Sequence, residues 1–416
     1  MAAEPARDVA AVVEINRIGS EGDGVADGAN GPVYLARALP GERFAVGPAG
    51  SELVGPPSPS RRGTTLCPHF PACGGCTVQH MDEPTYRAWK ADLLVGAFSR
   101  HDLLPQIEPM RSVPLQSRRR ATFGGRHETG GFAFGFHGPK SHEIVAVPQC
   151  AVLHPAILAG LEVLRQIAQR AALLPNGEAR VSVLVAAQGL DVTVSAGRGS
   201  AGRDLLSDLA TIVGTASIAR LTLNGEPAVQ RIRPTVTLAG HDVAPPSAAF
   251  LQAVAQAEME IAAIILAALP KRAKRVADLF AGLGTFTLAL AARVQVHAYD
   301  SERRSIEALM AGANGARGLK PVATTVRDLF LDPLSALELN RFDAVVFDPP
   351  RAGARAQAQA IARSSVPKVI AVSCNPATLA RDVATMVAGG YAIDRVVPID
   401  QFLYTPHLEA VVVLRR

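Results

Sequence analysis

Cys374 is the residue of this sequence whose type and position most clearly could do chemistry. It follows an apolar run that predicts a strand, Val369 to Val372, and precedes Asn375 and Pro376. A solitary cysteine is commonly a small buried apolar residue, but Asn-Pro after a strand indicates a turn rather than a core element. A thiolate in such a place can add to an electron-poor carbon, so we interpret Cys374 as a covalent nucleophile.

Glu409 is a candidate base that would act with this nucleophile. It follows His407 and precedes a last apolar run, residues 410–414, which predicts a buried strand. Partial burial of a carboxylate raises its pKa toward that of a useful base. Methylation at C5 of uracil needs such a pair, because a thiolate must add to C6 and a base must later remove the C5 proton. The alternative is that Glu409 is a surface residue at a strand end and His407 is structural.

A turn with two glycines predicts where a nucleotide-like cofactor binds. A short apolar strand ends at Asp278, Gly282 and Gly284 follow, and an apolar helix begins near Thr285. Glycine lets the backbone approach a ligand closely, and the first N–H groups of a helix have no partner within it. Asp300, at the end of the next strand, is placed to accept ribose hydroxyls. The dinucleotide pattern G-x-G-x-x-G is not completed, which favours S-adenosylmethionine over NAD or FAD.

Two further aspartates follow predicted strands of the same region. Asp328 ends one of them, and Asp348 opens the sequence DPPRAG after another. Ligands of open α/β sheets bind beyond the carboxyl ends of the strands, so we expect these carboxylates to face one crevice. Asp328 would meet the adenine amino group there, and the prolines after Asp348 would leave that loop with carbonyls to present. The alternative for either aspartate is capping of the next helix.

The elements around these residues predict an α/β fold with three domains. In residues 247–416 a long helix precedes apolar strands that alternate with helices, which is typical of a Rossmann-like domain. Residues 61–246 mix strands with helices and predict an α+β middle domain. Residues 1–60 combine short β-rich segments, glycine turns and a linker, which predict a small β module.

The other four cysteines have the spacing of a metal or iron–sulfur site. Cys67, Cys73 and Cys76 lie within ten residues, and Cys150 follows about seventy residues later. Four thiolates in this arrangement fit zinc or an iron–sulfur cluster. His69 is a further possible ligand on spacing, although four cysteines already complete a set. The alternative is that these are unpaired surface cysteines.

Composition and charge restrict the partners. The 42 Lys and Arg against 37 Asp and Glu give a net charge of +5, which is compatible with a polyanion. The run Arg118, Arg119 and Arg120 is expected to hold RNA phosphates, whereas the alternating phenylalanines of residues 132–136 are expected to fill a core. The first ten residues do not resemble a signal peptide, and no apolar run is long enough to span a bilayer. We therefore expect a cytoplasmic protein with no membrane partner.

Four segments together resemble one known family. DLFAGLGTFTLALA, FDPPRAG, VSCNP and TPHLE occur in the order and spacing of the bacterial RNA 5-methyluridine methyltransferase family, within residues 247–416. The resemblance implies S-adenosylmethionine as cofactor, RNA as partner, Cys374 as nucleophile and Glu409 as base. It also implies residues that surround the cofactor or the target base, namely Gln252, Phe280, Gly282, Gly284, Thr285, Asp300, Asp328 and Asp348, with Phe250 of the F-x-Q motif toward RNA. The sequence departs from the family at Val254 and Thr285, where Asn is common, and at Asp300, where Glu is.

The cysteine group resembles the [4Fe-4S] module of the ribosomal-RNA branch of this family, including its GGC-x-x-QH tail. That branch also begins with a small barrel of the TRAM type, and residues 12–46 are similar to a shortened form of it. The resemblance implies a [4Fe-4S] cluster on Cys67, Cys73, Cys76 and Cys150 and a monomer that methylates 23S ribosomal RNA. Three alternatives stay open: the same chemistry on transfer RNA, a non-catalytic iron–sulfur RNA-binding protein, and an amino methyltransferase. The last would place an aromatic residue where Arg351 follows the two prolines.

Overall fold

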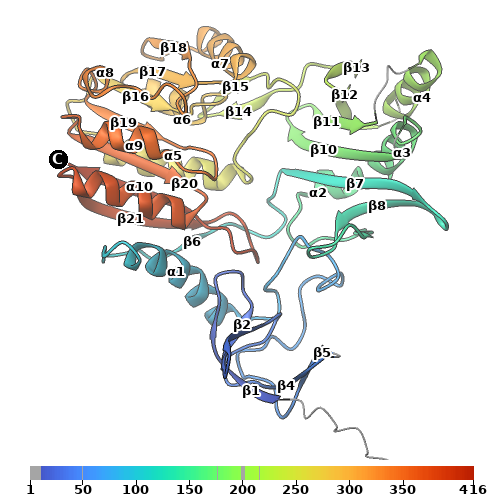
Figure 1. Ribbon diagram of the computed structural model, residues 1–416. Coiled ribbons are helices and arrows are strands. Elements are labelled where there is room, and N and C mark those ends of the chain that lie inside the picture. The colour runs from blue at the N-terminus through green and yellow to red at the C-terminus, as the bar shows by residue number, and fades with distance from the viewer. Residues whose placement is uncertain (1–10, 49, 176, 198–201, 215) are drawn as a thin grey trace, which may run out of the picture.

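The structure is a computed structural model that describes residues 11–48, 50–175, 177–197, 202–214 and 216–416. The first ten residues, on which the expectation about a signal peptide rested, lie outside these ranges. Among the described residues, the strands form a five-stranded, a seven-stranded and an eight-stranded sheet and a separate two-stranded hairpin. Figure 1 shows the N-terminal strands below and the other two large sheets side by side above them.

The C-terminal domain is built on the eight-stranded sheet, in the order β18-β17-β16-β19-β20-β22-β21-β6. Its strands are β6 (Arg111–Ser112), β16 (Arg275–Leu279), β17 (Gln295–Asp300), β18 (Val322–Val326), β19 (Ala344–Phe347), β20 (Lys368–Ser373), β21 (Ala392–Asp400) and β22 (Glu409–Arg415). Its helices are α5 (Ala255–Ala268), α6 (Thr285–Ala291), α7 (Arg303–Gly315), α8 (Ala336–Leu339), α9 (Arg355–Ala362) and α10 (Pro376–Ala388). The predicted α/β class is confirmed.

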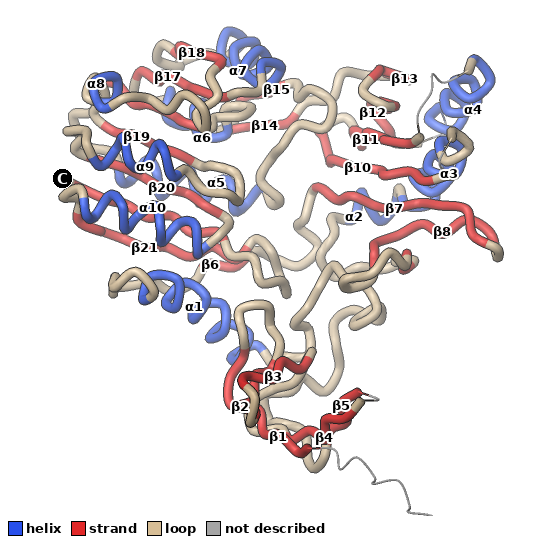
Figure 2. The backbone as a smooth tube through the Cα atoms, in the orientation of Figure 1, coloured by secondary structure: helices blue, strands red, loops and turns tan. Residues whose placement is uncertain are grey.

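The alternating direction of the apolar side chains along these strands explains why helices cover both faces of the sheet. Side chains of successive strand residues point to opposite faces, and the strands of this sheet are apolar on both. Val276 and Val346 pack in one apolar layer with α5 and α6, whereas Ala277 and Val345 pack in a second layer with α9 and α10. Figure 2 shows the helices in front of and behind the strands of this domain. A sheet buried on both faces fixes its strands firmly, so the loops at their ends have rigid supports.

Two features of the sheet decide where those loops meet. Parallel strand β16 has β17 on one side and β19 on the other, so the chain order reverses between β16 and β19. A crevice opens beyond the carboxyl ends of the strands at such a reversal. Beside this crevice, β22 runs antiparallel to β20 with Ser373 opposite Ala410. The residue after β20 and the first residue of β22 therefore lie across from each other.

The middle domain carries the seven-stranded sheet. Its order is β13-β12-β11-β10-β7-β8-β9. The elements are β7 (Arg120–Glu128), β8 (Gly131–His137), β9 (Ile144–Val145), α2 (Pro155–Ala159), α3 (Leu161–Ala171), β10 (Glu178–Ala186), β11 (Gly189–Ala196), α4 (Arg203–Gly214), β12 (Ile218–Leu223) and β13 (Glu226–Gln230). Phe134 is buried in the core under this sheet, and Phe132 and Phe136 pack against that core. The prediction that the alternating phenylalanines fill a core is confirmed.

The N-terminal module is a five-stranded antiparallel sheet with a small core. Its strands are β1 (Ala11–Ile18), β2 (Gly24–Gly28), β3 (Gly31–Leu35), β4 (Arg43–Gly47) and β5 (Gly50–Leu53), in the order β3-β2-β1-β4-β5. Ile15, Ala26, Leu35 and Ala38 form the core. Within the described residues β3 and β5 stand at opposite edges and are not paired with each other, so we describe an open sheet.

The structure differs from the predicted division at residues 61–246. Helix α1 (Glu83–Ser99), strand β6 and the hairpin of β14 (Val236–Leu238) and β15 (His241–Val243) fall inside that range but pack on the C-terminal domain. Helix α1 packs there through apolar contacts, because Leu94 and Phe98 share a buried layer with α10. Figure 1 shows α1 beside α10. None of the helices within the described ranges has the length and apolar character needed to cross a membrane.

A buried ion pair ties α1 to the end of β21. Lys90 Nζ lies 2.9 Å from Asp400 Oδ1, and both side chains are fully buried. Nζ also donates to the carbonyls of Phe402 and His407, and the Tyr86 hydroxyl donates to the other oxygen of Asp400. These bonds hold the loop between β21 and β22 against helix α1. They matter for the site because this loop leads into Glu409.

We predict that Lys90→Met lowers the free energy of unfolding by about 3–5 kcal/mol, because it leaves the Asp400 carboxylate buried without its cation. Urea unfolding followed by intrinsic fluorescence measures the change. Lys271→Met serves as the matched control, since Lys271 is exposed. Equal midpoints for the two variants would contradict a structural role for the pair.

Candidate active site

The loop between β16 and α6 forms one wall of the crevice. Phe280, Gly282 and Gly284 all have positive φ, of 62°, 54° and 86°. A Cβ on Gly284 would lie 2.2 Å from Leu309 Cδ1, so only glycine fits there, whereas a Cβ on Gly282 would meet nothing within 4 Å. The backbone at Gly282 is thus open to an approaching ligand. Thr285 begins α6 directly after this loop.

Asp300 holds that loop in place. Its Oδ2 accepts a hydrogen bond from the Gly282 N–H at 2.9 Å, and its Oδ1 accepts one from the Glu302 N–H at 2.8 Å. A carboxylate has about four lone-pair sites, so both oxygens can still accept from hydroxyl groups. The structure therefore assigns Asp300 a support role and leaves the expected ribose contact as a prediction.

Asp328 shows the capping contacts that were the alternative for this residue. Its Oδ1 accepts from the N–H groups of Phe330 and Leu331, at 2.9 and 3.3 Å. These bonds place the half-exposed Phe330 ring against Phe280, with 5.4 Å between the ring centroids. The two rings form an aromatic wall beside the glycine loop, while a contact of Asp328 with adenine stays a prediction.

A chain of hydrogen bonds connects two buried carboxylates across the crevice. Gln252 Nε2 donates to Asp348 Oδ2 at 2.8 Å. Gln401 Nε2 donates both to Gln252 Oε1 and to Glu409 Oε2, each at 2.7 Å. Glu409 is 1% exposed and Gln401 is fully buried. The four side chains come from β22, from the loops after β19 and β21, and from the segment before α5.

Burial makes both carboxylates of this chain weak acids. It raises the pKa of Glu409 well above its ordinary value, and the nearby Asp348 adds to that rise while the Gln401 hydrogen bond opposes it. Burial likewise raises the pKa of Asp348 to about 7, against the lowering by its bond from Gln252. A raised pKa brings a carboxylate closer to the range that suits proton transfer.

Cys374 faces these carboxylates. The β20–β22 register puts it across from Glu409, as described above. Burial raises the pKa of the thiol to about 11, the charges of Glu409 and Asp348 contribute, and Arg351 acts in the opposite direction. The resting residue is therefore a thiol, and ionisation must accompany its reaction.

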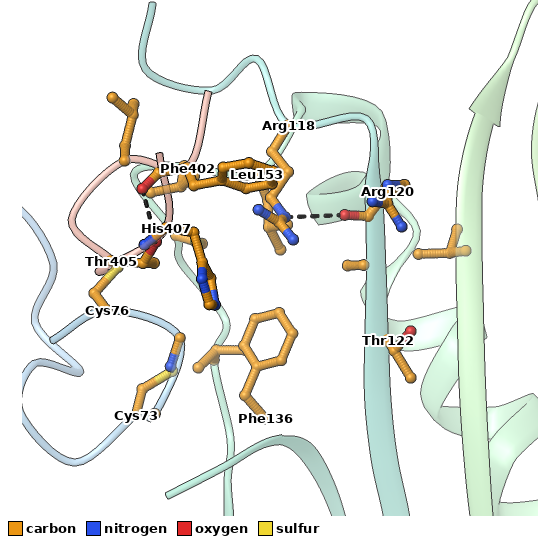
Figure 3. A pocket seen from close by; sticks show the side chains of 18 of the residues that line it. Cys73, Cys76, Arg118, Arg120, Thr122, Phe136, Leu153, Phe402, Thr405 and His407 are labelled. Carbon is orange, nitrogen blue, oxygen red and sulfur yellow. Dashed lines mark hydrogen bonds between the residues drawn. The ribbon is translucent and has the colours of Figure 1, made fainter. Parts of the chain in front are cut away.

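The three arginines predicted to hold RNA differ in their surroundings. Arg119 is buried, pairs with Glu258 at 2.5 Å and donates to the Gln252 carbonyl at 3.1 Å. Because its guanidinium is engaged inside the protein, we no longer assign it to phosphate binding. Arg120 instead stacks on Phe250, with 4.3 Å from its guanidinium carbon to the ring centroid. Arg118 donates to the Arg120 carbonyl at 3.2 Å (Figure 3).

A cavity of about 670 Å³ lies where the cysteine loop, the middle domain and the C-terminal domain meet. Its lining includes Cys67, Cys73, Cys76, Cys150, Arg118, Arg120, Arg351 and His407. Figure 3 shows Cys73 and Cys76 on one side and Arg118 and Arg120 on another, with His407 between them. Arg351 Nη2 lies 3.1 Å from His407 Nε2, and burial together with Arg351 lowers the pKa of His407 to about 4. His407 is therefore neutral at physiological pH.

The predicted cluster cysteines all line this cavity as free thiols. Burial raises the pKa of Cys76 to about 12, and the charges of Cys150, Cys73 and Cys67 contribute. The four thiols are thus close enough to influence one another. Within the described ranges, no group of three or more His, Cys, Asp or Glu side chains is arranged to hold a metal ion.

Comparison with known proteins places this site in a family. A family model described as "tRNA (Uracil-5-)-methyltransferase" matches residues 210–416. An RNA methyltransferase of Agrobacterium fabrum is 40% identical over 97% of this chain and 99% of its own length. A 23S rRNA (uracil(1939)-C(5))-methyltransferase of Chromohalobacter salexigens is 33% identical over 97% of this chain and 89% of its own.

The chain belongs to the RNA (uracil-5-)-methyltransferase family. It is therefore an enzyme, as predicted, and the alternatives of a non-catalytic RNA-binding protein and of an amino methyltransferase are wrong. The fold agrees with a solved structure, that of Pyrococcus abyssi tRNA (uracil-54, C5)-methyltransferase in complex with S-adenosyl-L-homocysteine. The TM-score is 0.74 at 20% identity, over 97% of this chain and 99% of the other.

Two residues of this methyltransferase site were not recognised as functional in the sequence. Gln401 lies eight positions before Glu409, in a segment with no local pattern that marks an amide as a partner of the carboxylate. Arg351 was considered only as the residue that replaces an aromatic side chain after the two prolines. Its position after the β19 strand, like that of Asp348, was the available signal.

We predict that Cys374 of the free methyltransferase reacts slowly with iodoacetamide near neutral pH. Only the thiolate reacts, so the rate should rise about tenfold per pH unit until the pH approaches about 11. Mass spectrometry of the Cys374 peptide measures the rate, and Cys374→Ser confirms the assignment. A rate that levels off near neutral pH would contradict the burial of this thiol beside two carboxylates.

Proposed function

We propose that this enzyme methylates C5 of a uridine in RNA, with S-adenosylmethionine as the methyl donor, Cys374 as nucleophile and Glu409 as base. The observation that carries the proposal is the register of β20 and β22, which brings Cys374, directly after β20, across from Glu409. Glu409 is joined to Asp348 by a buried chain of hydrogen bonds. If Cys374 were only structural and Glu409 only a surface residue, there would be no reason for the two to lie together beside the crevice at the β16–β19 reversal.

The residues at the sheet reversal fit the proposed methyl donor. The backbone at Gly282 is open, Asp300 presents carboxylate oxygens, and Phe280 and Phe330 offer an aromatic wall for a purine. S-adenosylmethionine, when bound, supplies an electrophilic methyl group on a sulfonium. The role of the protein is then to hold that methyl group near C5 and to exclude water.

Cys374 and Glu409 carry out the remaining steps of the proposed reaction. The partly exposed Cys374 thiol releases its proton to solvent, and the thiolate sulfur bonds to C6. The electrons of the C5–C6 double bond shift toward C5, which makes C5 nucleophilic enough to take the methyl group. Glu409 then removes the C5 proton, the electrons of that bond restore the C5–C6 double bond, and the C6–sulfur bond breaks. Asp348 and Gln252 lie where they can hydrogen-bond the edge of the ring.

The cavity that Arg351 lines supports recognition of a single, unstacked nucleotide, and the charge of Arg351 also acts on Cys374. A base in a duplex cannot reach a partly buried thiol, so the target uridine must be looped out or flipped. Arg118 and Arg120 line the cavity, and Phe250, 66% exposed, forms a platform next to Arg120. Such a pairing of cations and aromatic rings suits phosphates and stacked bases.

For the RNA species we favour 23S ribosomal RNA. The support is the relative named for that substrate, which is 33% identical across nearly the whole chain. Transfer RNA is the second candidate, because the matching family model bears a transfer-RNA name.

We also propose that Cys67, Cys73, Cys76 and Cys150 bind a [4Fe-4S] cluster. All four thiols line one cavity, and burial of Cys76 makes its thiolate unfavourable unless a cation compensates it. The Gly75 N–H already points to Cys73 Sγ at 3.4 Å, as suits a ligand sulfur. We favour a cluster over zinc, because an N–H group beside a ligand sulfur suits a [4Fe-4S] site. The cluster would fix the 67–80 loop and takes no part in the methyl transfer.

We predict that Cys374→Ala lowers methylation by at least about 1,000-fold and that Glu409→Gln accumulates a covalent protein–RNA adduct. The first change removes the nucleophile, and the second removes the base that resolves the adduct. Radiolabelled S-adenosylmethionine and denaturing gels measure both, on ribosomal and on transfer RNA from a strain that lacks the gene. Turnover by Cys374→Ala would disprove the mechanism, and labelling of transfer RNA alone would overturn the ribosomal substrate.

We predict that protein purified without oxygen contains four iron and four sulfide per chain and that Cys76→Ser loses them. Metal and sulfide analysis with visible absorption measures the content. Cys374→Ser is the matched control and should keep the full content, because Cys374 lies outside the proposed ligand set. Zinc in place of iron, or equal loss from both variants, would contradict the proposal.

A further inference from the structure

We infer that Gln401 is a positioning residue for Glu409: its amide holds one carboxylate oxygen, Oε2, and leaves the other, Oε1, as the atom that accepts the C5 proton. The inference rests on the proposed function. It adds the residue that orients the base, Gln401, and the oxygen of Glu409 that takes the proton, Oε1. It concerns the resolution of the covalent adduct and not its formation.

The hydrogen-bond chain determines how the Gln401 amide is oriented. In the ionised form, in which Glu409 acts as a base, a carboxylate only accepts hydrogen bonds, and Asp348 and Glu409 stand at the two ends of the chain. Gln252 uses its N–H for Asp348, so its oxygen is left to accept from Gln401. Both N–H groups of the Gln401 amide are therefore used, one toward Gln252 and one toward Glu409 Oε2. If the Gln401 amide were flipped, its oxygen would face Gln252 Oε1 and Glu409 Oε2, which are both acceptors.

This arrangement leaves two buried oxygens without a partner among the described residues, Gln401 Oε1 and the other oxygen of Glu409, and only the second can take up a proton as a base. Glu409 Oε1 is buried and has no hydrogen-bond partner within the described part of the chain. An unpaired buried carboxylate oxygen is costly, and native structures rarely keep one without a use. Since Oε2 is held by a donor, a proton that Glu409 takes up goes to Oε1. The proton of C5 is the one that the reaction must remove, and it goes there while sulfur leaves C6.

The same hydrogen bond sets the pH range in which Glu409 works. The charged groups that face Glu409 are Asp348 after β19, which raises the pKa of Glu409, and Arg120 at the start of β7, which lowers it. The Cys374 thiol after β20 faces it as well. Gln401 is the hydrogen-bonding group that lowers the pKa. Glu409 acts as a base only when ionised, so loss of this bond moves the acidic limb of the kcat profile to higher pH.

The test uses the full-length enzyme and two variants of this glutamine. Gln401→Met keeps the volume and removes both donors, and Gln401→Glu keeps the shape but cannot donate when ionised.

We expect kcat to fall about 100-fold in each variant, because the base is no longer held in line with the C5 proton. We expect KM for RNA and for S-adenosylmethionine to stay within about twofold. The Cys374–RNA adduct should accumulate in single turnovers, and the acidic limb should shift to higher pH. Thermal unfolding shows whether Gln401→Met folds, and Gln401→Glu decides the question if it does not.

Gln359→Met, on the exposed face of α9, is the matched control and should behave like the wild type. If the wild type forms no adduct, the proposed function itself fails. If the wild type forms and resolves the adduct while both variants keep its kcat and pH profile, the inference about Gln401 is overturned and the proposed function stands. Loss of activity through weaker RNA binding, with no accumulated adduct, would also overturn it, because that result indicates a structural role.

Discussion

The antiparallel pairing of β20 with β22 is the constraint on which the site depends. Because Ser373 lies opposite Ala410, the residue after one strand and the first residue of the other face each other across a single strand spacing. A shift of one residue would turn Glu409 to the other face of the sheet. Both strands are buried on both faces, so such a shift would also expose apolar side chains and is strongly disfavoured. The position of Cys374, the proposed nucleophile, relative to Glu409, the proposed base, is therefore determined by the packing of the core.

Burying two carboxylates and a thiol at one place is unfavourable, and the surroundings explain how the fold accommodates it. Two amides, Gln252 and Gln401, supply donors to Asp348 and Glu409 without adding charge. These neutral donors lower the two pKa values only in part, so burial still keeps them raised, whereas an arginine in their place would lower them further. The buried guanidinium of Arg119 is directed to Glu258 and supports the Gln252 backbone.

Two buried ion pairs join other parts of the chain to the C-terminal domain. Helix α1 reaches it through Lys90 and Asp400, and the middle domain reaches it through Arg119 and Glu258. Both buried pairs end on segments that carry site residues, the loop before Glu409 and the segment that carries Gln252. Through these anchors, the geometry of the site depends on domains that contribute few of its reacting groups.

The sequence by itself determined much of the fold class of this protein and was enough to propose its reacting groups. Apolar strands that end in Asp, Gly or Cys place those residues at one edge of a sheet, since parallel strands share their carboxyl ends, and this local rule was enough for Gly282, Asp348 and Cys374. Only the tertiary structure decided what those groups touch. Gln401 meets Glu409 through a loop that Lys90 anchors, Arg119 turns inward while Arg120 stays at the cavity, and α1 joins the C-terminal domain. Each of these outcomes depends on contacts between residues far apart in the chain, which local periodicity and spacing do not contain.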